Sequence, residues 1–459
     1  MNRGPHVAPA ADPWACQGEA AAELEKNGMV IGREGGGPRA VLEAAGMESA
    51  PHGGACGEGG AWSAGEAADG TGPPRFDDHI PLARPWLGRA EQEAVREVLE
   101  SGWISQGPRV AAFEAALARY VGGAHAVATN AATSALHLGL VVAGVRRGDE
   151  VICPASTCMA TANALCHAGA RPVFAEIDPH TFNLDPHSVE ALVRPATRAV
   201  VVVHQIGQPA DLAAFEELCG RKGLLLIEDA ATALGARYRG RYVGSHGRPT
   251  CFSFHPRKMI TTGEGGMLLL GCATAAARAR ALRATGASIS DLVRHQARGV
   301  LQQAYHEVGY NYRMTDIQAA LGLVQLARLP EMLRARRDQA AYYHELFEGW
   351  REVQVPRVAE GAEPCWSSYC VKLLGPAAAR RDDVIAMMAA EGISTRRGIP
   401  PLYREPCFAA RGEAPLPGAE EVARSTLFLP IFPGLERADQ RRVAAALHRA
   451  LRSSHPRLD

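Results

Sequence analysis

Residues 199–229 read AVVVVHQIGQPADLAAFEELCGRKGLLLIED, and this stretch decides the fold. Two apolar runs, Ala199–Val203 and Leu224–Ile227, flank a helical segment at Ala210–Arg221. Runs that are apolar at every position, without alternation, are typical of strands buried on both faces. A strand–helix–strand unit of this kind places its two strands parallel in one sheet. The stretch therefore predicts the centre of an α/β domain.

The alternation of strand and helix continues on both sides of this unit. Further strands are predicted at Ala126–Thr129, Glu150–Cys153, Pro172–Ile177, Thr250–Phe254 and Gly266–Leu270. Helices are predicted at Glu91–Ser101, Val110–Tyr120, Ser134–Val142 and Met159–Ala168. Together these segments predict a mostly parallel, seven-stranded central sheet with helices on both faces.

The chain divides into three regions. Residues 1–75 hold 16 of the 48 glycines and show no sustained period, so they are predicted to be a disordered low-complexity extension. Residues 76–330 form the predicted large α/β domain. An arginine-rich helix at Leu329–Trp350 leads into residues 331–459, which are predicted to form a smaller C-terminal α+β domain. The elements predicted in that domain are a strand at Ser368–Leu373 and helices at Arg381–Glu391 and Ala438–Leu451.

The composition is that of a soluble globular protein, with 47% hydrophobic and 21% charged residues. Basic and acidic residues both number 49, so the net charge is zero and nothing indicates a nucleic-acid partner. No apolar stretch approaches the length of a membrane span, and the N-terminus lacks the pattern of a secretion signal.

The eleven cysteines are scattered without a CxxC pair, and several, such as Cys166, Cys219 and Cys251, sit in apolar stretches. This pattern predicts reduced, buried thiols instead of disulfides or a zinc site. We therefore expect a cytoplasmic protein without a bound metal.

Several polar residues follow the predicted strands, where the functional groups of doubly wound sheets collect. Asp229 ends the strand at Leu224–Ile227, and Lys258 follows the strand at Thr250–Phe254 in a loop that runs into a glycine turn. Each has an ordinary reading when taken alone. The aspartate is typical of a helix cap or a surface salt bridge, the lysine of a solvated loop, and Ser253 and Thr133-Ser134 of capping residues.

Four segments with these residues form a recognisable set. They are TNAATSALH at residues 129–137, IEDAATALGA at 227–236, FSFHPRKMITTGEGG at 252–266 and GYNYRMTDIQAA at 309–320. In order and spacing they resemble the DegT/DnrJ/StrS-type sugar aminotransferases. The resemblance extends from about Ile80 to about Leu451 and is most specific in the lysine loop with its glycine turn.

The resemblance implies the aspartate aminotransferase fold (fold type I) and pyridoxal 5′-phosphate (PLP) as cofactor. Lys258 matches the family's lysine, whose amine forms a Schiff base with the PLP aldehyde and then moves the proton. Asp229 matches the carboxylate that faces the pyridine nitrogen. A carboxylate at that place keeps the nitrogen protonated, because opposite charges at short range favour the ionised state of each partner.

The resemblance also implies a phosphate site shared between two subunits. The helix that opens at Ala132, Thr133 and Ser134 offers free backbone N–H groups and a positive dipole end. Ser253 matches a serine of the family that donates to the phosphate. Asn311 matches an asparagine that reaches the phosphate from the partner subunit, so a homodimer with shared active sites is expected.

Two positions depart from the commonest form of the family. Thr232 stands where a His or Gln near the ring hydroxyl is usual, and a threonine hydroxyl reaches less far. Cys158 stands where an aromatic side chain usually stacks on the PLP ring, and sulfur packs against a ring more weakly. Both positions remain predicted cofactor contacts. His255, three residues before Lys258, is interpreted as a packing residue.

The sequence therefore predicts a PLP-dependent transaminase that converts a keto sugar, nucleotide-linked, into an amino sugar with glutamate or glutamine as donor. One alternative is an aminotransferase for a cyclitol ketone (an inosose), which Cys158 and Thr232 leave open. The other is a non-catalytic regulator with the same fold, against which the intact Lys258, Asp229 and Ser253 argue. A nicotinamide enzyme is disfavoured because no GxGxxG follows an early strand.

Overall fold

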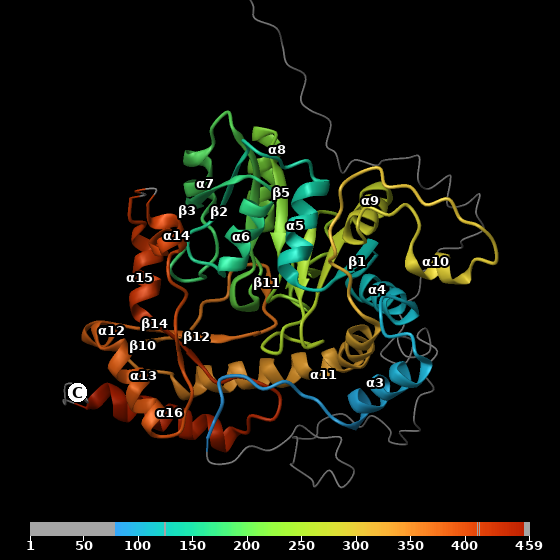
Figure 1. Cartoon of the computed structure of the whole chain (residues 1–459). Helices are drawn as coiled ribbons and strands as arrows, with labels where there is room; N and C mark the ends of the chain where they lie inside the picture. Colours follow the sequence, from blue (N-terminus) through green and yellow to red (C-terminus); the bar gives the residue numbers. More distant parts are fainter. Residues whose placement is uncertain (1–78, 124, 411, 413, 454–459) are drawn as a thin grey trace, which may run out of the picture.

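A computed structural model describes residues 79–123, 125–410, 412 and 414–453 of the chain (Figure 1). The predicted disordered extension, residues 1–75, lies outside the described residues. None of the described helices combines the length and the apolar character that crossing a bilayer requires.

The large sheet has seven strands in the order β1-β9-β8-β5-β4-β2-β3. Its strands are β1 (His125–Thr129), β2 (Glu150–Pro154), β3 (Arg171–Ala175), β4 (Thr197–Val203), β5 (Leu225–Asp229), β8 (Thr250–Ser253) and β9 (Gly266–Leu270). Neighbouring strands pair in parallel from β3 through β8, whereas β9 is antiparallel to both β8 and β1. The predicted seven-stranded, mostly parallel sheet is confirmed.

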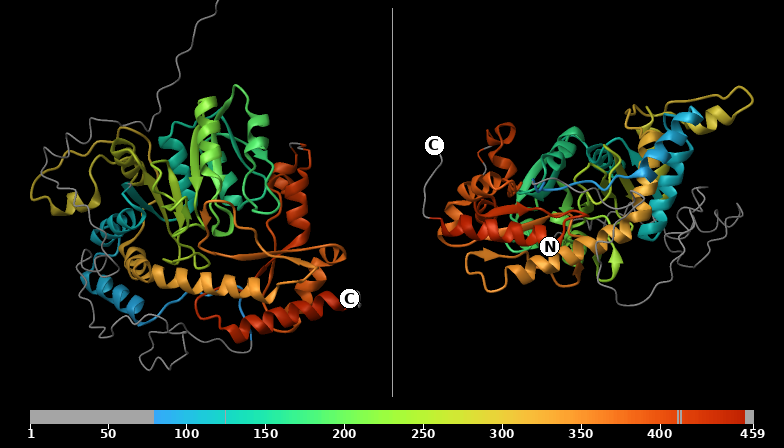
Figure 2. Two further views of the ribbon diagram at one scale, coloured as in Figure 1. Left: turned by 180° about the vertical axis from the view of Figure 1, so that it is seen from behind. Right: turned by 90° about the horizontal axis from the view of Figure 1, so that it is seen from below.

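Helices cover both faces of this sheet (Figures 1 and 2). Within β4, Ala199 and Val201 join the core with α5, α6 and α9, while Val200 and Val202 join the core with α7 and α8. On the other half of the sheet, β8 and β9 pack against α4 and α11. The helices named here are α3 (Arg89–Ser101), α4 (Pro108–Val121), α5 (Ala132–Val142), α6 (Met159–His167), α7 (Pro186–Leu192), α8 (Leu212–Lys222), α9 (Ala273–Arg283) and α11 (Asp316–Leu346).

A second, antiparallel sheet has the order β10-β12-β14-β13 and packs with α13 and α16 around a core of its own. Ile80 belongs to this core and bridges to Ile393, so the first described residues join the C-terminal elements. The sheet and its helices are β10 (Val353–Gln354), β12 (Tyr369–Leu373), β13 (Arg396–Arg397), β14 (Thr426–Leu429), α12 (Pro376–Ala379), α13 (Arg381–Ala390), α14 (Pro406–Ala409), α15 (Pro417–Ser425) and α16 (Arg437–Arg452). The remaining elements are the small sheet β6 (Arg237–Tyr238), β7 (Arg241–Tyr242) and β11 (Ala362–Glu363), helix α10 (Asp291–Gln296), and 3₁₀ turns at Gln205–Gly207 and Leu402–Arg404.

The helix predicted at Leu329–Trp350 begins much earlier, at Asp316, and ends at Leu346. Thr315 caps it by accepting a hydrogen bond from the Gln318 N–H. Its first half is buried on almost every side, because α11 passes between α3, α4 and the large sheet, and a helix buried all round shows no amphipathic period. Since α11 runs through residue 330, the predicted division of the chain at that residue stays a prediction.

The carboxylate of Asp316, the first residue of α11, caps the N-terminus of α4. It accepts hydrogen bonds from the backbone N–H groups of Gly107 at 2.8 Å, Arg109 at 3.0 Å and Val110 at 3.0 Å. These donors are among the first N–H groups of a helix, which have no partner within the helix. One buried side chain thus joins two helices that are more than 200 positions apart in the sequence.

We expect Asp316→Ala to lower the free energy of unfolding by about 2–4 kcal/mol, because it leaves buried N–H donors without an acceptor. Asp316→Asn keeps one acceptor oxygen, and the loss should be smaller. The midpoint of urea denaturation measures both, with Asp338→Asn, an exposed carboxylate on the same helix, as the control. An Asp316→Ala midpoint equal to that of the control would contradict the capping role.

Candidate active site

The pairing of the strands brings the predicted site residues to one edge of the large sheet. Gly266, the first residue of β9, pairs with Thr129 at the end of β1 and with Ser253 at the end of β8. Asp229 at the end of β5 pairs with Cys251, two residues before Ser253. The start of α5, the loop that carries Lys258 and the carboxylate of Asp229 therefore all follow strand ends at the same edge.

Asp229 is buried, and its carboxylate is held by two neutral donors. The Thr161 hydroxyl donates to Oδ2 at 2.7 Å, and the Ala231 N–H donates to Oδ1 at 3.1 Å. Thr157 Oγ1 lies 3.1 Å from Thr161 Oγ1. Sequence reasoning missed both threonines. The signal for Thr161 was a polar residue on the inner face of a helix that follows a buried strand. Thr157 stands four positions before it, ahead of that helix.

The loop that carries Lys258 is closed at its neck by hydrogen bonds to Phe254. The Thr262 N–H and the Thr261 hydroxyl both donate to the Phe254 carbonyl, at 2.9 and 3.0 Å. Gly263, with φ +80°, makes the turn that returns the chain to β9. Within the loop, Lys258 N–H donates to the His255 carbonyl at 2.8 Å, so the lysine lies on a fixed turn.

His255 belongs to the backbone of this loop. Its Nδ1 accepts a hydrogen bond from the Arg257 N–H at 3.2 Å. This contact is local to the loop, and the packing role of His255 stays a prediction.

Burial lowers the pKa of the Lys258 ammonium below its usual value, while electrostatic attraction from Asp229 and, less strongly, from Cys158 acts in the opposite direction. A lowered pKa increases the fraction of neutral amine at neutral pH, and the neutral amine is the nucleophile. Asp229 and Cys158 therefore lie within electrostatic range of the Lys258 amine.

Of the three lysines between residues 79 and 453, Lys258 is the one without an ion pair. Lys222 lies 3.3 Å from Glu190 at the end of α8, and Lys372 is buried in β12 with Glu421 as its partner. A paired or surface ammonium is a poor nucleophile, because the proton is held or the amine is solvated. Elimination within the described chain therefore points to Lys258 as the reactive amine.

The N-terminus of α5 approaches the sheet very closely at Gly266. A Cβ added at Gly266 would lie 2.5 Å from the carbonyl carbon of Ala131 and 2.6 Å from the nitrogen of Ala132. Helix α5 has no side-chain cap, so its first N–H groups are left for a ligand. The Ser134 hydroxyl donates to Asn130 Oδ1 at 2.7 Å, which fixes this turn. A helix N-terminus of this kind is a site for an anionic group such as a phosphate.

The two departures from the family pattern take different positions. Thr232 donates its hydroxyl hydrogen to the His204 carbonyl at 2.6 Å, so toward a cofactor it could act only as an acceptor. Cys158 is exposed and is the residue before α6. None of the nine cysteines of the described chain is in a disulfide, and six of them are buried. Cys166, expected to be buried, is exposed because it lies on the solvent side of α6.

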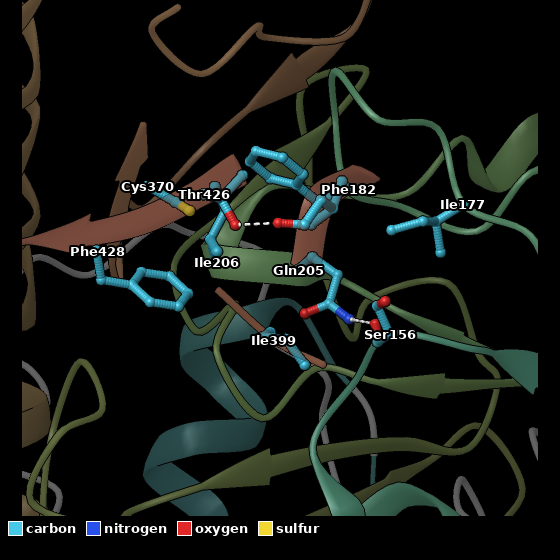
Figure 3. Close-up of a pocket in the computed structure, with 10 residues that line it drawn as sticks. Ser156, Ile177, Phe182, Gln205, Ile206, Cys370, Ile399, Thr426 and Phe428 are labelled. Carbon is cyan, nitrogen blue, oxygen red and sulfur yellow. Dashed lines mark hydrogen bonds between the residues drawn. The ribbon is translucent and has the colours of Figure 1, made fainter. Parts of the chain in front are cut away.

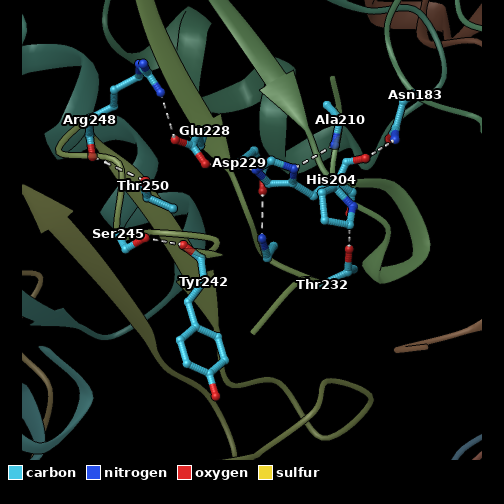
Figure 4. Close-up of polar contacts among 12 residues, drawn as sticks. Asn183, His204, Ala210, Glu228, Asp229, Thr232, Tyr242, Ser245, Arg248 and Thr250 are labelled. Carbon is cyan, nitrogen blue, oxygen red and sulfur yellow. Dashed lines mark hydrogen bonds and ion pairs between the residues drawn. The ribbon is translucent and has the colours of Figure 1, made fainter. Parts of the chain in front are cut away.

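A pair of fully buried ionisable groups, His204 and Glu228, stands behind the strand end of Asp229 (Figure 4). His204 Nδ1 accepts from the Ala210 N–H at 3.0 Å, so Nε2 carries the hydrogen and donates to Glu228 at 3.0 Å. Burial alone raises the pKa of Glu228, but the hydrogen bond and the electrostatic attraction of His204, with smaller effects of His246 and Arg248, outweigh it, and the net pKa is lowered.

The main chain of His204 contacts two of the predicted site residues, Asp229 and Thr232. Its N–H donates to the Asp229 carbonyl at 3.1 Å, and its carbonyl accepts from Thr232. The contact with Glu228 joins residues 24 positions apart, and no local sequence pattern indicates which acid faces the histidine.

Asn311 contacts a different part of the chain from the other predicted site residues. It is exposed and bridges to Ala284 at the end of α9. Its neighbours are held firmly: Tyr310 and Tyr312 stack with ring centroids 4.9 Å apart, and the Tyr312 carbonyl accepts from the Asn130 N–H at 2.9 Å. The side chain of Asn311 is therefore presented on an ordered segment.

A small cavity lies next to this site, between the large sheet and the second sheet (Figure 3). It is lined mainly by apolar side chains, among them Phe182, Ile206 and Phe428. Its volume of about 10 Å³ is enough for one water molecule. Neither Lys258 nor Asp229 lines it, so it is distinct from the candidate site.

Comparisons with known proteins agree with this geometry. The sequence profile of the DegT/DnrJ/EryC1/StrS aminotransferase family matches residues 85–448. GDP-perosamine synthase of Caulobacter vibrioides is 41% identical over 374 residues, which cover 81% of this chain and 98% of that protein. The spore coat polysaccharide biosynthesis protein SpsC of Bacillus subtilis is 38% identical, over 78% of this chain and 94% of its own. Spr1654 of Streptococcus pneumoniae, solved in its PLP form, has a TM-score of 0.76 at 28% identity, covering 81% of this chain and 98% of that one.

The fold and the sheet-edge site thus define a PLP-dependent aminotransferase of fold type I. More particularly, the chain belongs to the DegT/DnrJ/EryC1/StrS aminotransferase family, whose members act in amino-sugar formation. The residues present fit PLP. A buried carboxylate, an amine with a lowered pKa and an uncapped helix N-terminus beside a close glycine contact lie at one sheet edge.

We expect Lys258→Ala to prevent covalent attachment of PLP and to abolish turnover, because no other lysine of the described chain has a free amine. Borohydride reduction of the protein with PLP, followed by mass spectrometry, measures the attachment. Lys222→Ala is the matched control and should be labelled like the unmodified chain. A reduced PLP adduct that persists in Lys258→Ala would contradict the assignment.

Proposed function

We propose that the protein transfers an amino group from glutamate or glutamine to a nucleotide-linked keto sugar. The observation that carries this proposal is the combination of Lys258 and Asp229 at one sheet edge with a helix N-terminus suited to phosphate. The 41% identity to GDP-perosamine synthase, whose name denotes a nucleotide-linked amino sugar, supports the substrate class.

PLP, when bound, supplies an aldehyde that carries the amino group and a pyridine ring that accepts electrons. The N–H groups at the start of α5 would hold the phosphate end, with Ser253 as a further donor. Asp229 would face the ring nitrogen and favour its protonated form, because its carboxylate is buried and kept in place by Thr161 and Ala231. The Nζ of Lys258 would supply the amine that binds the aldehyde and the base that moves the proton.

The low pKa of Lys258 suits both of its roles. An ammonium with its usual pKa near 10.4 would be almost fully protonated at neutral pH and could neither attack a carbonyl nor accept a proton. Burial shifts the balance toward the free amine, and Asp229 limits that shift. Both effects are properties of the protein before any cofactor binds.

We further propose that two copies of the chain form the active sites together. The segment between α9 and Asn311 exposes apolar side chains that a free monomer would leave in water: Val300 is 99% exposed and Val308 93%. Figure 1 shows this segment, with α10, projecting from the body of the molecule. A projecting apolar segment next to an ordered, exposed Asn311 is suited to a contact with a second subunit.

Two observations support a second candidate substrate class, the cyclitol ketones. Cys158 is exposed, and the Thr232 hydroxyl already donates its hydrogen to a main-chain carbonyl. An aromatic side chain over the cofactor also borders the space where the substrate enters, so a small Cys158 leaves room for a differently shaped ketone. The chemistry at Lys258 and Asp229 would be the same for both classes.

The substrate class is tested by the half-reaction in which the aminated cofactor meets a ketone. We expect nucleotide-linked keto sugars to restore the PLP absorbance at least tenfold faster than cyclitol ketones, because each hydrogen-bonded group of a bound nucleotide adds about 1–2 kcal/mol of binding. Stopped-flow absorbance measures both rates. Faster reaction with an inosose would replace the keto-sugar assignment with the cyclitol alternative.

The sharing of active sites is tested by mixing two inactive variants. We expect Lys258→Ala and Asn311→Ala each to be nearly inactive, and their mixture to recover roughly a quarter of the unmodified activity after subunit exchange. Half of the dimers are then mixed, and each has one site with both an intact lysine and an intact partner asparagine. If Asn311 served its own subunit, the mixture would remain inactive.

A further inference from the structure

We propose that Thr161 is a positioning residue for Asp229 and that Thr157 and Thr161 form a directed chain of hydroxyl donors ending on its carboxylate. The chain would hold the Asp229 carboxylate in a fixed orientation toward the ring nitrogen of the cofactor. This inference rests on the proposed role of Asp229 and deepens it, because it names the groups that keep that carboxylate ready for a cationic partner.

The direction of the chain follows from the chemistry of its end. An ionised carboxylate has no hydrogen to donate, so the Thr161 hydroxyl spends its one hydrogen on Asp229 Oδ2, at 2.7 Å. Thr161 Oγ1 can then only accept from Thr157, which lies at 3.1 Å, so Thr157 is the donor. A hydroxyl that itself accepts a hydrogen bond is a stronger donor, so Thr157 strengthens the contact with Asp229.

The burial of the chain makes it effective. Thr161 is completely buried and Thr157 is 2% exposed, so water does not compete for either hydroxyl. Hydrogen bonds from neutral donors to a buried carboxylate favour its charged form. Unlike an arginine or lysine partner, the two threonines leave the negative charge of Asp229 uncancelled, and that charge is what a protonated ring nitrogen requires.

The local backbone explains why Thr161 can reach Asp229. Thr161 occupies the first turn of α6, where its N–H donates to the Cys158 carbonyl at 3.0 Å. Its hydroxyl makes no bond to the helix and donates to Asp229. Thr157 stands four residues earlier, before the helix begins, so the two side chains face each other. The same short segment thus carries Cys158 toward the cofactor side and the two hydroxyls toward Asp229.

Thr161→Val is nearly isosteric and removes only the hydroxyl. We expect it to raise the dissociation constant of PLP about tenfold, as for loss of a hydrogen bond to a charged group. We also expect the pH profile followed by the absorbance of bound PLP to move by roughly one pH unit, because a buried hydrogen-bond donor to the group that faces the ring nitrogen is lost. Thr161→Ser should restore both values, and Thr157→Val should change both in the same direction but by less.

Thr426→Val is the matched control. Thr426 is also completely buried and donates one hydrogen bond, to the Val422 carbonyl at 2.6 Å, but it lies in the second sheet. Its variant should leave the PLP affinity and the pH profile unchanged. Unchanged values in Thr161→Val, or failure of Thr161→Ser to rescue, would overturn the proposal.

Two further outcomes are separable. If Thr161→Val does not fold, Thr157→Val decides, and an unshifted pH profile in that variant overturns the proposal. If the unmodified protein binds no PLP at all, the proposed function itself fails. That result is obtained without any threonine variant, so it is distinct from failure of the threonine proposal.

Discussion

The site depends on the backbone ladder that joins β5, β8, β9 and β1. Because side chains alternate between the two faces of a strand, a slip of one residue in β8 would turn Ser253 to the opposite face and separate the Lys258 loop from Asp229. Gly266 sits in the middle of this ladder, paired on one side with Thr129 and on the other with Ser253. Its missing side chain lets the start of α5 approach, so the same residue that fixes the register also admits the helix end that would bind phosphate.

The end of β5 is supported from both sides by different means. On the side of the site, Thr161 and Ala231 hold the Asp229 carboxylate with neutral donors. Behind it, Glu228 is fully buried and is held by His204. A buried ionised group is costly unless it is paired, and this arrangement pairs Glu228 with the His204 N–H and with Arg248 at 3.8 Å. Its effect is to fix the main chain of His204, which in turn bonds to Asp229 and Thr232.

The strands of the large sheet were predictable because their burial is written into the sequence as apolar runs without alternation. The places of Asp229, Ser253 and the Lys258 loop at the ends of those strands followed from the same signal, whereas their roles in the site came from the resemblance of four segments to the family. The start of α11 was not predictable in this way, because residues 316–326 are buried on nearly every side and show no period. Thr161 and the contact between His204 and Glu228 were missed for another reason: a hydrogen bond across the fold depends on which side chains face each other, which no local pattern records.

Cys158 and Thr232 place the remaining constraint on how the cofactor can be held. Thr232 has given its hydrogen to a main-chain carbonyl, and the thiol of Cys158 offers less dispersion attraction to a ring than an aromatic side chain would. Less of the binding energy can then come from the face and the hydroxyl edge of the ring. More of it must come from the two ends of the molecule, the phosphate at α5 and the ring nitrogen at Asp229. A site of this kind depends strongly on the orientation of one carboxylate, and for that reason the hydroxyl chain behind Asp229 matters more here than in a site closed by an aromatic ring.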